Sequence, residues 1–292
     1  MEHEPDPQEL VADLVHLLDV EQTGPDQFLG RRKIGGVGRV FGGQVIAQAL
    51  AAAERTVDEL RPAHSLHAYF LRGGSEDHPI DFRIERDFDG GSFSNRRVIA
   101  SQQGKPILNL LASFQSRAEG VHHASAMPDV AGPDSLETEA GLRLRLPDNL
   151  SQTTRNWLLR SRPIEIRPVE PEQWFRLKPS PPVTHYWIRA KSRLPDDARL
   201  HRSVLAYASD MGLLRTCMLP HAFDSANQSI RVASLDHALW LHADFRADEW
   251  LLYSCDSPWA GNARGFNRGK IYTQDGRLVA EVAQEGMIRV VG

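Results

Sequence analysis

Two stretches decide the fold of this chain: Leu66-His67-Ala68-Tyr69-Phe70-Leu71 and Asp236-His237-Ala238-Leu239-Trp240-Leu241. They align at an offset of 236 − 66 = 170 residues, and Gly91 aligns with Gly261 at the same offset. Ile107-Leu108 aligns with Leu278-Val279 at 278 − 107 = 171. An offset that persists along the sequence indicates an internal repeat, so we expect the same structural unit twice.

Each of the two stretches follows a helical segment and begins a series of strand-like segments. The first helix is the alanine-rich segment Gln44–Ala53, and the second is predicted at Asp197–Leu214. Turn residues separate the strand-like segments. These segments are His64–Leu71, Ile80–Phe88, Ser94–Gln102 and Pro106–Gln115 in the first half, and Ile164–Pro168, Thr184–Ala190, Ile230–His242, Trp250–Ser257, Gly265–Thr273 and Leu278–Val290 in the second. A long helix buries itself best in a curved sheet, so we predict an α+β fold of two helices, each wrapped by an antiparallel sheet.

The length of 292 residues fits two domains at roughly 100–200 residues each. We expect a first unit at residues 1–118 and a second unit at residues 161–292. The intervening segment, 119–160, is polar and acidic and contains Pro128, Pro133 and Pro147. We interpret it as a partly helical connector over the surface.

Composition and charge exclude several classes of function. The net charge is −4 and the isoelectric point is about 6.3, which argues against nucleic acid as a partner. Apolar runs fall well short of the ~20 residues that span a bilayer, so we expect no stable membrane insertion. The N-terminus lacks the pattern of a signal peptide and the C-terminus is not Ser-Lys-Leu, so we expect a cytoplasmic protein.

We expect no metal and no other cofactor. Cys217 and Cys255 form no Cys-x-x-Cys pair, and we interpret them as reduced thiols. His122-His123 lies in the connector and is interpreted as a surface pair. The sequence has no Gly-x-Ser-x-Gly, no His-Glu-x-x-His and no Walker A motif. The glycines at positions 35–43 also miss the dinucleotide-binding spacing, because Phe41 stands where the last glycine belongs.

Two polar residues, Asp210 and Gln284, stand among apolar neighbours. Asp210 lies in the second predicted helix, where its neighbours one turn away are Ala206, Tyr207, Leu213 and Leu214. Burying an unpaired carboxylate costs free energy, so a buried Asp210 would have hydrogen-bond donors or a functional role. The alternative is that Asp210 is half exposed and solvated. Gln284 shares a strand face with Val282 and Ile288, which indicates either a structural hydrogen bond or a site residue.

Ser234 taken alone is a serine in a strand. Asp236 and His237 suggest a catalytic triad with it, but adjacent strand residues point to opposite faces. Asp236 and His237 therefore cannot both contact Ser234 directly.

The sequence resembles the acyl-CoA thioesterase II family, whose members are double-hotdog enzymes. The resemblance extends from about Leu10 to Val290. The motifs that carry it are Val40-Phe41-Gly42-Gly43-Gln44-Val45, His64–Leu71, Ala233-Ser234-Leu235-Asp236-His237, Glu249-Trp250-Leu251-Leu252-Tyr253, Ala263-Arg264-Gly265-Phe266 and Gln284-Glu285-Gly286. The resemblance implies a fatty acyl-CoA substrate, and the exposed edges of hotdog sheets indicate a homodimer or homotetramer.

The family's active site is an Asp, a Thr or Ser, and a Gln in the second unit. Carried over by motif, these residues are Asp210, Ser234 and Gln284, at spacings of 234 − 210 = 24 and 284 − 234 = 50. Thr is common where this chain has Ser234, and serine keeps the hydroxyl but lacks the methyl group that restricts the rotamer.

The resemblance implies direct attack of water on the thioester carbonyl, with Asp210 as general base. Ser234 and Gln284 would orient the water. Gly42 and Gly43 begin the first helix and are expected near the oxyanion. His64 matches a family position near the site.

Two other functions deserve comparison. A hotdog hydratase acting on enoyl-CoA would carry an Asp/His dyad on one segment, but the first histidine after Asp210 is His221. A non-catalytic acyl-CoA sensor would lack the polar trio, whereas all three positions here carry competent side chains. The sequence therefore favours an acyl-CoA thioesterase.

Overall fold

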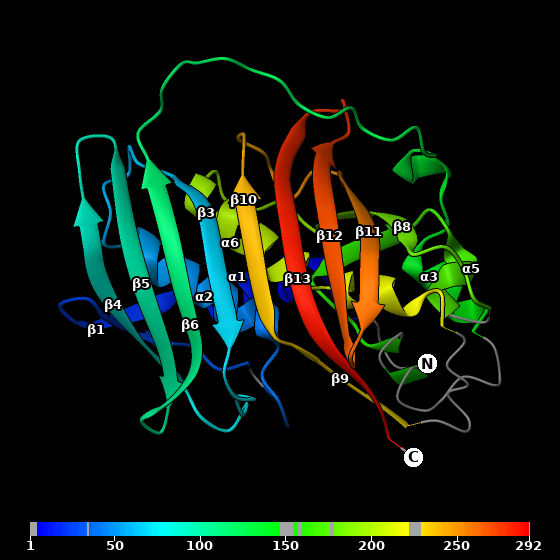
Figure 1. The fold of residues 1–292 in the computed structure, drawn as a ribbon, viewed down its shortest axis with the longest axis horizontal. Coiled ribbons are helices and arrows are strands. Elements are labelled where there is room, and N and C mark those ends of the chain that lie inside the picture. Colours follow the sequence, from blue (N-terminus) through cyan, green and yellow to red (C-terminus); the bar gives the residue numbers. More distant parts are fainter. Residues whose placement is uncertain are drawn as a thin grey trace.

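A computed structural model describes residues 5–33, 35–146, 155–156, 159–175, 178–221 and 229–291. The described strands form one antiparallel sheet in the order β1-β2-β4-β5-β6-β3-β10-β13-β12-β11-β8-β7, and β9 also pairs with β13 (Figure 1). The first-half strands are β1 Val20–Gly24, β2 Gln27–Gly30, β3 Ala63–Phe70, β4 Ile80–Asp89, β5 Phe93–Gln102 and β6 Lys105–Gln115. The second-half strands are β7 Ile164–Pro168, β8 Val183–Ala190, β9 Ser229–Ser234, β10 Asp236–Leu241, β11 Leu251–Gly261, β12 Arg264–Thr273 and β13 Leu278–Val291.

The described helices are α1 Pro7–Leu18, α2 Gly42–Glu54, α3 Glu139–Leu144, α5 Pro171–Phe175 and α6 Ala198–Ser209, with 3₁₀ turns η1 Pro133–Ser135 and η2 Leu213–Met218. The long helices α2 and α6 lie on the same face of the sheet (Figure 1). Each follows two strands and precedes the remaining strands of its half, so the order of strands and long helix repeats, with α5 as an additional element between β7 and β8.

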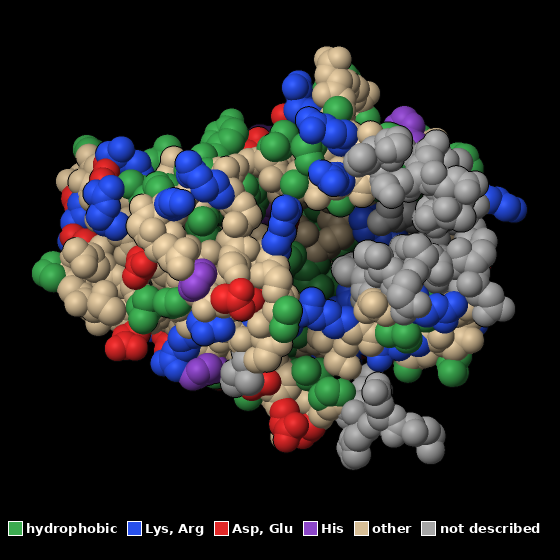
Figure 2. Space-filling view, turned by 90° about the horizontal axis from the view of Figure 1, so that it is seen from below, with side chains coloured by type: hydrophobic (Ala, Val, Ile, Leu, Met, Phe, Trp, Pro, Cys, Tyr) green, Lys and Arg blue, Asp and Glu red, His purple; other side chains and the backbone are tan. Residues whose placement is uncertain are grey.

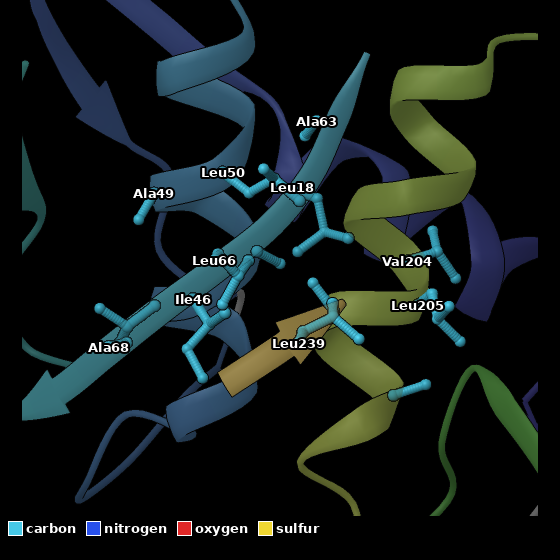
Figure 3. Close-up of a cluster of buried hydrophobic side chains, with 14 of the residues drawn as sticks. Leu18, Ile46, Ala49, Leu50, Ala63, Leu66, Ala68, Val204, Leu205 and Leu239 are labelled. Atoms are coloured by element: carbon cyan, nitrogen blue, oxygen red, sulfur yellow. The ribbon is translucent and has the colours of Figure 1, made fainter. Parts of the chain in front are cut away.

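The two halves join where β3 pairs with β10, the strands that contain the two repeated stretches. Leu66 of β3 is the register partner of Leu239 of β10, and both side chains are buried. Figure 3 shows these two leucines directed toward the helices α2 and α6. The sequence repeat therefore becomes a central strand pair that makes the two sheets continuous.

Helices α2 and α6 pack against each other in opposite directions. The start of α2 lies beside the end of α6, since a Cβ built on Gly43 would be 2.4 Å from the carbonyl oxygen of Tyr207. At the other end, Glu54 of α2 pairs with Arg202 of α6 at 2.5 Å. Ala47, Ala49, Ala52 and Ala53 of α2 are fully buried, and these short side chains allow the close approach.

Two predicted elements differ from the structure. The helix predicted at Asp197–Leu214 ends at Ser209, and Asp210 is its C-cap residue. Gly212 then adopts a left-handed conformation with φ 86°, which breaks the helix before η2 begins. Asp210 therefore stands at the end of a helix, where the backbone turns, and not on a helix face.

The strand predicted at Ile230–His242 is two strands separated by a β-bulge. Ser234 pairs with Gly286, whereas Ala238 pairs with Ala283, so residues 235–237 face only residues 284–285. A bulge adds one residue to one strand and redirects the side chains beside it. This bulge lies directly opposite Gln284.

The predicted connector crosses the surface, as Figure 1 shows for its segment after β6. Its backbone accepts hydrogen bonds from the second half: Trp187 donates to the Ala131 carbonyl at 2.9 Å and Arg167 to the Pro133 carbonyl at 2.7 Å. Residues 147–154 and 157–158 of the predicted connector lie outside the described residues. Within the described ranges, no helix is long and apolar enough to cross a membrane.

Candidate active site

Three side chains that are distant in sequence meet at the bulge. The Gln284 side-chain amide Nε2 donates to Asp210 Oδ1 at 2.7 Å and to Ser234 Oγ at 2.9 Å. These residues come from the end of α6, the end of β9 and the middle of β13. The structure thus brings together the three positions that the motifs single out.

Gln284 is the centre of this arrangement and is fully buried. An amide nitrogen has two hydrogens, and both are used by Asp210 and Ser234. The amide oxygen Oε1 is buried without a hydrogen-bond partner among the described residues. Unpaired buried acceptors are uncommon, and this oxygen keeps its full capacity to accept a hydrogen bond.

Asp210 combines a buried carboxylate with few compensating donors. Burial raises its pKa from 3.8 to about 6, while the hydrogen bonds from Gln284 and from the Gly43 backbone N–H act in the opposite direction. The residue as a whole retains partial exposure. At neutral pH the group is therefore mostly ionised, yet it is a stronger base than an ordinary aspartate.

The start of α2 lies directly against this carboxylate. A Cβ built on Gly42 would lie 2.8 Å from Asp210 Oδ2 and 2.9 Å from Cζ of Phe70, so any side chain there would displace one of them. The N-terminal end of a helix carries partial positive charge, which favours the ionised form of Asp210. Gly42 and Gly43 thus lie against the Asp210 carboxylate.

His64 lies away from the three polar side chains. It is near the beginning of β3, whereas Phe70, which contacts Gly42, is at the end of that strand. The imidazole of His64 contacts Ser113 Oγ at 2.9 Å and the ring of Phe93. The structure does not bring His64 into contact with Asp210, Ser234 or Gln284.

Asp236 and His237 do not form a triad with Ser234. Asp236 accepts a hydrogen bond from the Glu285 backbone N–H at 2.6 Å, and His237 contacts Ser209 Oγ at 2.9 Å. Burial lowers the pKa of His237 to about 3, so its ring is neutral. Neither Asp236 nor His237 therefore pairs with Ser234. Among the residues that the structure describes, no group of three His, Cys, Asp or Glu side chains is arranged to hold a metal ion.

The sequence did not indicate which residues fix the backbone around Asp210. Tyr186 and Tyr253, in β8 and β11, donate hydrogen bonds to the carbonyls of Met211 and Ser209. The sequence signal for Tyr253 is that it ends the family motif Glu249-Trp250-Leu251-Leu252-Tyr253 in an apolar strand. A tyrosine in such a strand needs a partner for its hydroxyl, but the sequence does not say which one.

The fold and the site together define a double-hotdog protein with a polar trio at the end of its second central helix. Comparison with known proteins extends this assignment. The acyl-CoA thioesterase family model matches residues 156–287, and that of the acyl-CoA thioesterase N-terminal domain matches residues 31–115. The chain belongs to the acyl-CoA thioesterase family, a family of hydrolases.

Individual relatives agree with this assignment. Acyl-coenzyme A thioesterase 8 of Homo sapiens is 42% identical over 94% of this chain and 88% of its own length. Acyl-CoA thioesterase 2 of Haemophilus influenzae is 34% identical over 96% of this chain and 98% of its own. The crystal structure of an acyl-CoA thioesterase II, TesB2, from Mycobacterium marinum superposes with a TM-score of 0.77 at 39% identity, covering 96% of this chain and 98% of that one. The predicted double-hotdog fold and membership of the family are therefore confirmed.

Proposed function

We propose that this protein hydrolyses fatty acyl-CoA to a free fatty acid and coenzyme A by direct attack of a water molecule that Asp210 deprotonates. The observation that carries the proposal is the double donation from Gln284 to Asp210 and Ser234. It aligns a base, a hydroxyl and an amide around one point at the end of α6.

The hydrogen-bond arrangement supports water as the nucleophile. The two N–H bonds of the Gln284 amide diverge, so the oxygens of Asp210 and Ser234 are held apart by the amide between them. Ser234 Oγ accepts from Gln284, which leaves its hydrogen free to be donated. Gln284 separates Ser234 from Asp210, and among the described neighbours of Ser234 neither Asp236 nor His237 bonds to its hydroxyl. Ser234 is suited to orient a water molecule.

In the proposed reaction, water forms the new C–O bond while its proton moves to the Asp210 carboxylate. The C–S bond then breaks, and Asp210 returns its proton to the sulfur, so that coenzyme A leaves as the thiol and Asp210 is again a carboxylate. The developing oxyanion needs preorganised donors, and we assign this role to the start of α2 at Gly42 and Gly43. The support is that the start of α2 lies against Asp210, since a Cβ built on Gly42 would be 2.8 Å from Asp210 Oδ2. The Gly43 N–H donates to the ionised Asp210 and would turn to the oxyanion once Asp210 has taken up the proton.

Coenzyme A carries phosphates, which require nearby cations. Figure 2 views the molecule from the end at which β3 finishes and β9 lies, and shows a hollow with several Lys and Arg side chains along the described part of its rim. We place the nucleotide portion of the substrate on this rim. The net charge of the protein is −4, so a cluster of Lys and Arg at one place does not follow from its overall composition.

We also propose how the chain is divided into units, where the protein is located and how it assembles. Residues 1–118 and 161–292 would be the two hotdog units, with 119–160 as connector, and the protein would be a cytoplasmic homodimer or homotetramer. Support for self-association comes from large apolar side chains left exposed on the sheet, among them Tyr69 at 63% and Leu111 at 52%. Light scattering coupled to size exclusion gives the mass directly, and a monomer at micromolar concentration would contradict the proposed assembly.

The proposed activity is tested by incubating the protein with palmitoyl-CoA and a thiol reagent that reports free coenzyme A. Release of coenzyme A together with palmitate supports hydrolysis, whereas binding without release would indicate a sensor. In a second experiment, turnover of labelled palmitoyl-CoA is stopped rapidly by acid. Mass spectrometry should then find no acylated protein, and acyl label retained on Ser234 would overturn the direct-water mechanism.

A further inference from the structure

The end of α6 places Asp210, and this end is not explained by helix propensity. The apolar pattern of the sequence continues to Leu214, but the α-helix stops at Ser209. The last carbonyls of a helix lack partners within the helix and must find donors elsewhere. The donors for the carbonyls on either side of Asp210 therefore decide where this residue lies.

Two tyrosine hydroxyls supply those donors. Tyr253 Oη donates to the Ser209 carbonyl at 2.8 Å, and Tyr186 Oη donates to the Met211 carbonyl at 3.0 Å. Ser209 and Met211 are the residues immediately before and after Asp210. Both tyrosines are buried, with 0% and 3% of their surface exposed. Burial raises the pKa of each phenol above its ordinary value, so both hydroxyls stay protonated and can donate.

The two rings form one unit on the inner face of the sheet. Tyr186 of β8 and Tyr253 of β11 are register partners, and their rings meet edge to face at 5.1 Å between centroids. Gly269 of the next strand makes room for them, since a Cβ built there would lie 2.1 Å from Cε2 of Tyr253. His237 contacts the side chain of Ser209, the residue whose carbonyl accepts from Tyr253, at 2.9 Å. The position of each hydroxyl is thus fixed by its surroundings.

We propose that Tyr186 and Tyr253 are positioning residues for the reaction: by holding the carbonyls of Ser209 and Met211, they fix the Asp210 carboxylate against Gln284 and the start of α2. This inference rests on the proposed role of Asp210 as general base. Neither tyrosine needs to touch the substrate. A displacement of about 1 Å in a reacting group can lower a rate by as much as about 100-fold, so the backbone on both sides of the base matters.

The test compares Tyr253→Phe with Tyr272→Phe in the full-length protein. Tyr272 is a matched control because it is 1% exposed on the neighbouring strand β12, but its hydroxyl lies 3.4 Å from Ser125 Oγ, away from α6. We expect Tyr253→Phe to lower kcat at least about tenfold with KM little changed. Tyr272→Phe should keep kcat within about twofold of the parent.

The pH profile separates positioning from general loosening of the fold. The hydrogen bonds from Gln284 and Gly43 lower the pKa of Asp210, so a carboxylate that moves away from them has a higher pKa. In Tyr253→Phe the acid limb of kcat/KM should therefore move to higher pH, while in Tyr272→Phe it should stay where it is in the parent. A folded Tyr253→Phe with parental kcat and an unmoved acid limb would overturn the proposal, and so would an equal loss of kcat in Tyr272→Phe.

Two further variants keep the proposal testable if Tyr253→Phe does not fold. Tyr186→Phe removes the second hydroxyl and should change kcat and the acid limb in the same direction. Gly269→Ala keeps both hydroxyls but forces the Tyr253 ring to move, and should do the same. Asp210→Asn is measured alongside: if it is inactive while the tyrosine variants behave like the parent, only the positioning role fails. If Asp210→Asn is active, the proposed base itself is wrong.

Discussion

Replacing Asp210 by Asn is the most direct perturbation of the proposed mechanism. Asn keeps the size of the side chain, and its carbonyl oxygen can still accept from Gln284, which donates to Oδ1 at 2.7 Å in the parent. What it loses is the capacity to accept a proton. General-base catalysis typically contributes ~10²–10⁴-fold, so we expect kcat to fall at least about 100-fold with KM little changed.

The stability of this variant follows from the same burial. The Asp210 pKa of about 6 in the folded protein lies above the ordinary 3.8, and a difference of this size corresponds to about 3 kcal/mol against the folded state when the group is ionised. Above pH 6 the full cost is present, and below about pH 4 it disappears because both states are protonated. Asn avoids this cost, but its amide group faces the Gly43 N–H, which offsets part of the gain. We expect the melting temperature at pH 7 to be unchanged or up to about 5 °C higher, with the difference vanishing near pH 4.

The assay measures kcat, KM and melting temperature of Asp210→Asn beside those of Asp236→Asn. Asp236 is a suitable control because it is a partly buried aspartate two residues from Ser234, and Asn can keep its hydrogen bond from the Glu285 N–H. Asp236→Asn should retain kcat within about tenfold of the parent. A folded Asp210→Asn whose kcat is also within tenfold would refute the assignment of Asp210 as base.

Three further predictions address the site and the fold. The kcat/KM of the parent should fall about tenfold per pH unit below pH 6, because the Asp210 pKa of about 6 makes the base protonated there; a profile flat down to pH 5 would contradict this. Gln284→Leu removes a hydrogen bond that lowers the Asp210 pKa, so its acid limb should move to higher pH and kcat should drop at least about tenfold, as stopped-flow or steady-state rates over pH 5–8 will show. Glu54→Ala leaves the buried Arg202 without its partner at 2.5 Å, so the free energy of unfolding measured by chemical denaturation should fall by about 3–5 kcal/mol. The double variant Glu54→Leu/Arg202→Met should recover most of this loss, because it removes both buried charges. An unchanged denaturation midpoint for Glu54→Ala would show that the ion pair does not stabilise the fold.

The sequence determined the repeat and most of the secondary structure. The offset of 170–171 residues between matching stretches predicted two equivalent units, and the strands β3 and β10 that contain those stretches pair at the centre of the sheet. This worked because hydrophobic alternation and turn residues act locally, through strand periodicity and allowed backbone angles. The family motifs also identified Asp210, Ser234 and Gln284 as a group before any contact between them was visible.

Only the tertiary structure decided how these residues meet. The pattern predicted that α6 continues to Leu214, but hydroxyls from β8 and β11 satisfy the carbonyls beside Asp210 and Gly212 turns the chain, so the helix stops early. The pattern also predicted one strand across Ser234, whereas the bulge at residues 235–237 breaks it opposite Gln284. The bulge and the tyrosine hydrogen bonds depend on partners more than 20 residues away, which periodicity does not register; only Gly212 is a local signal.

His64 illustrates the same limit from the other side. A motif match placed it near the site, yet β3 carries it to the opposite end of the strand from Phe70 and the start of α2. Sequence similarity identifies the residues that match a family's motifs, because the sequence states the chemistry of each side chain. Distances among those residues follow from strand pairing, helix ends and bulges, and these are settled only when long-range hydrogen bonds and packing select one arrangement of the whole chain.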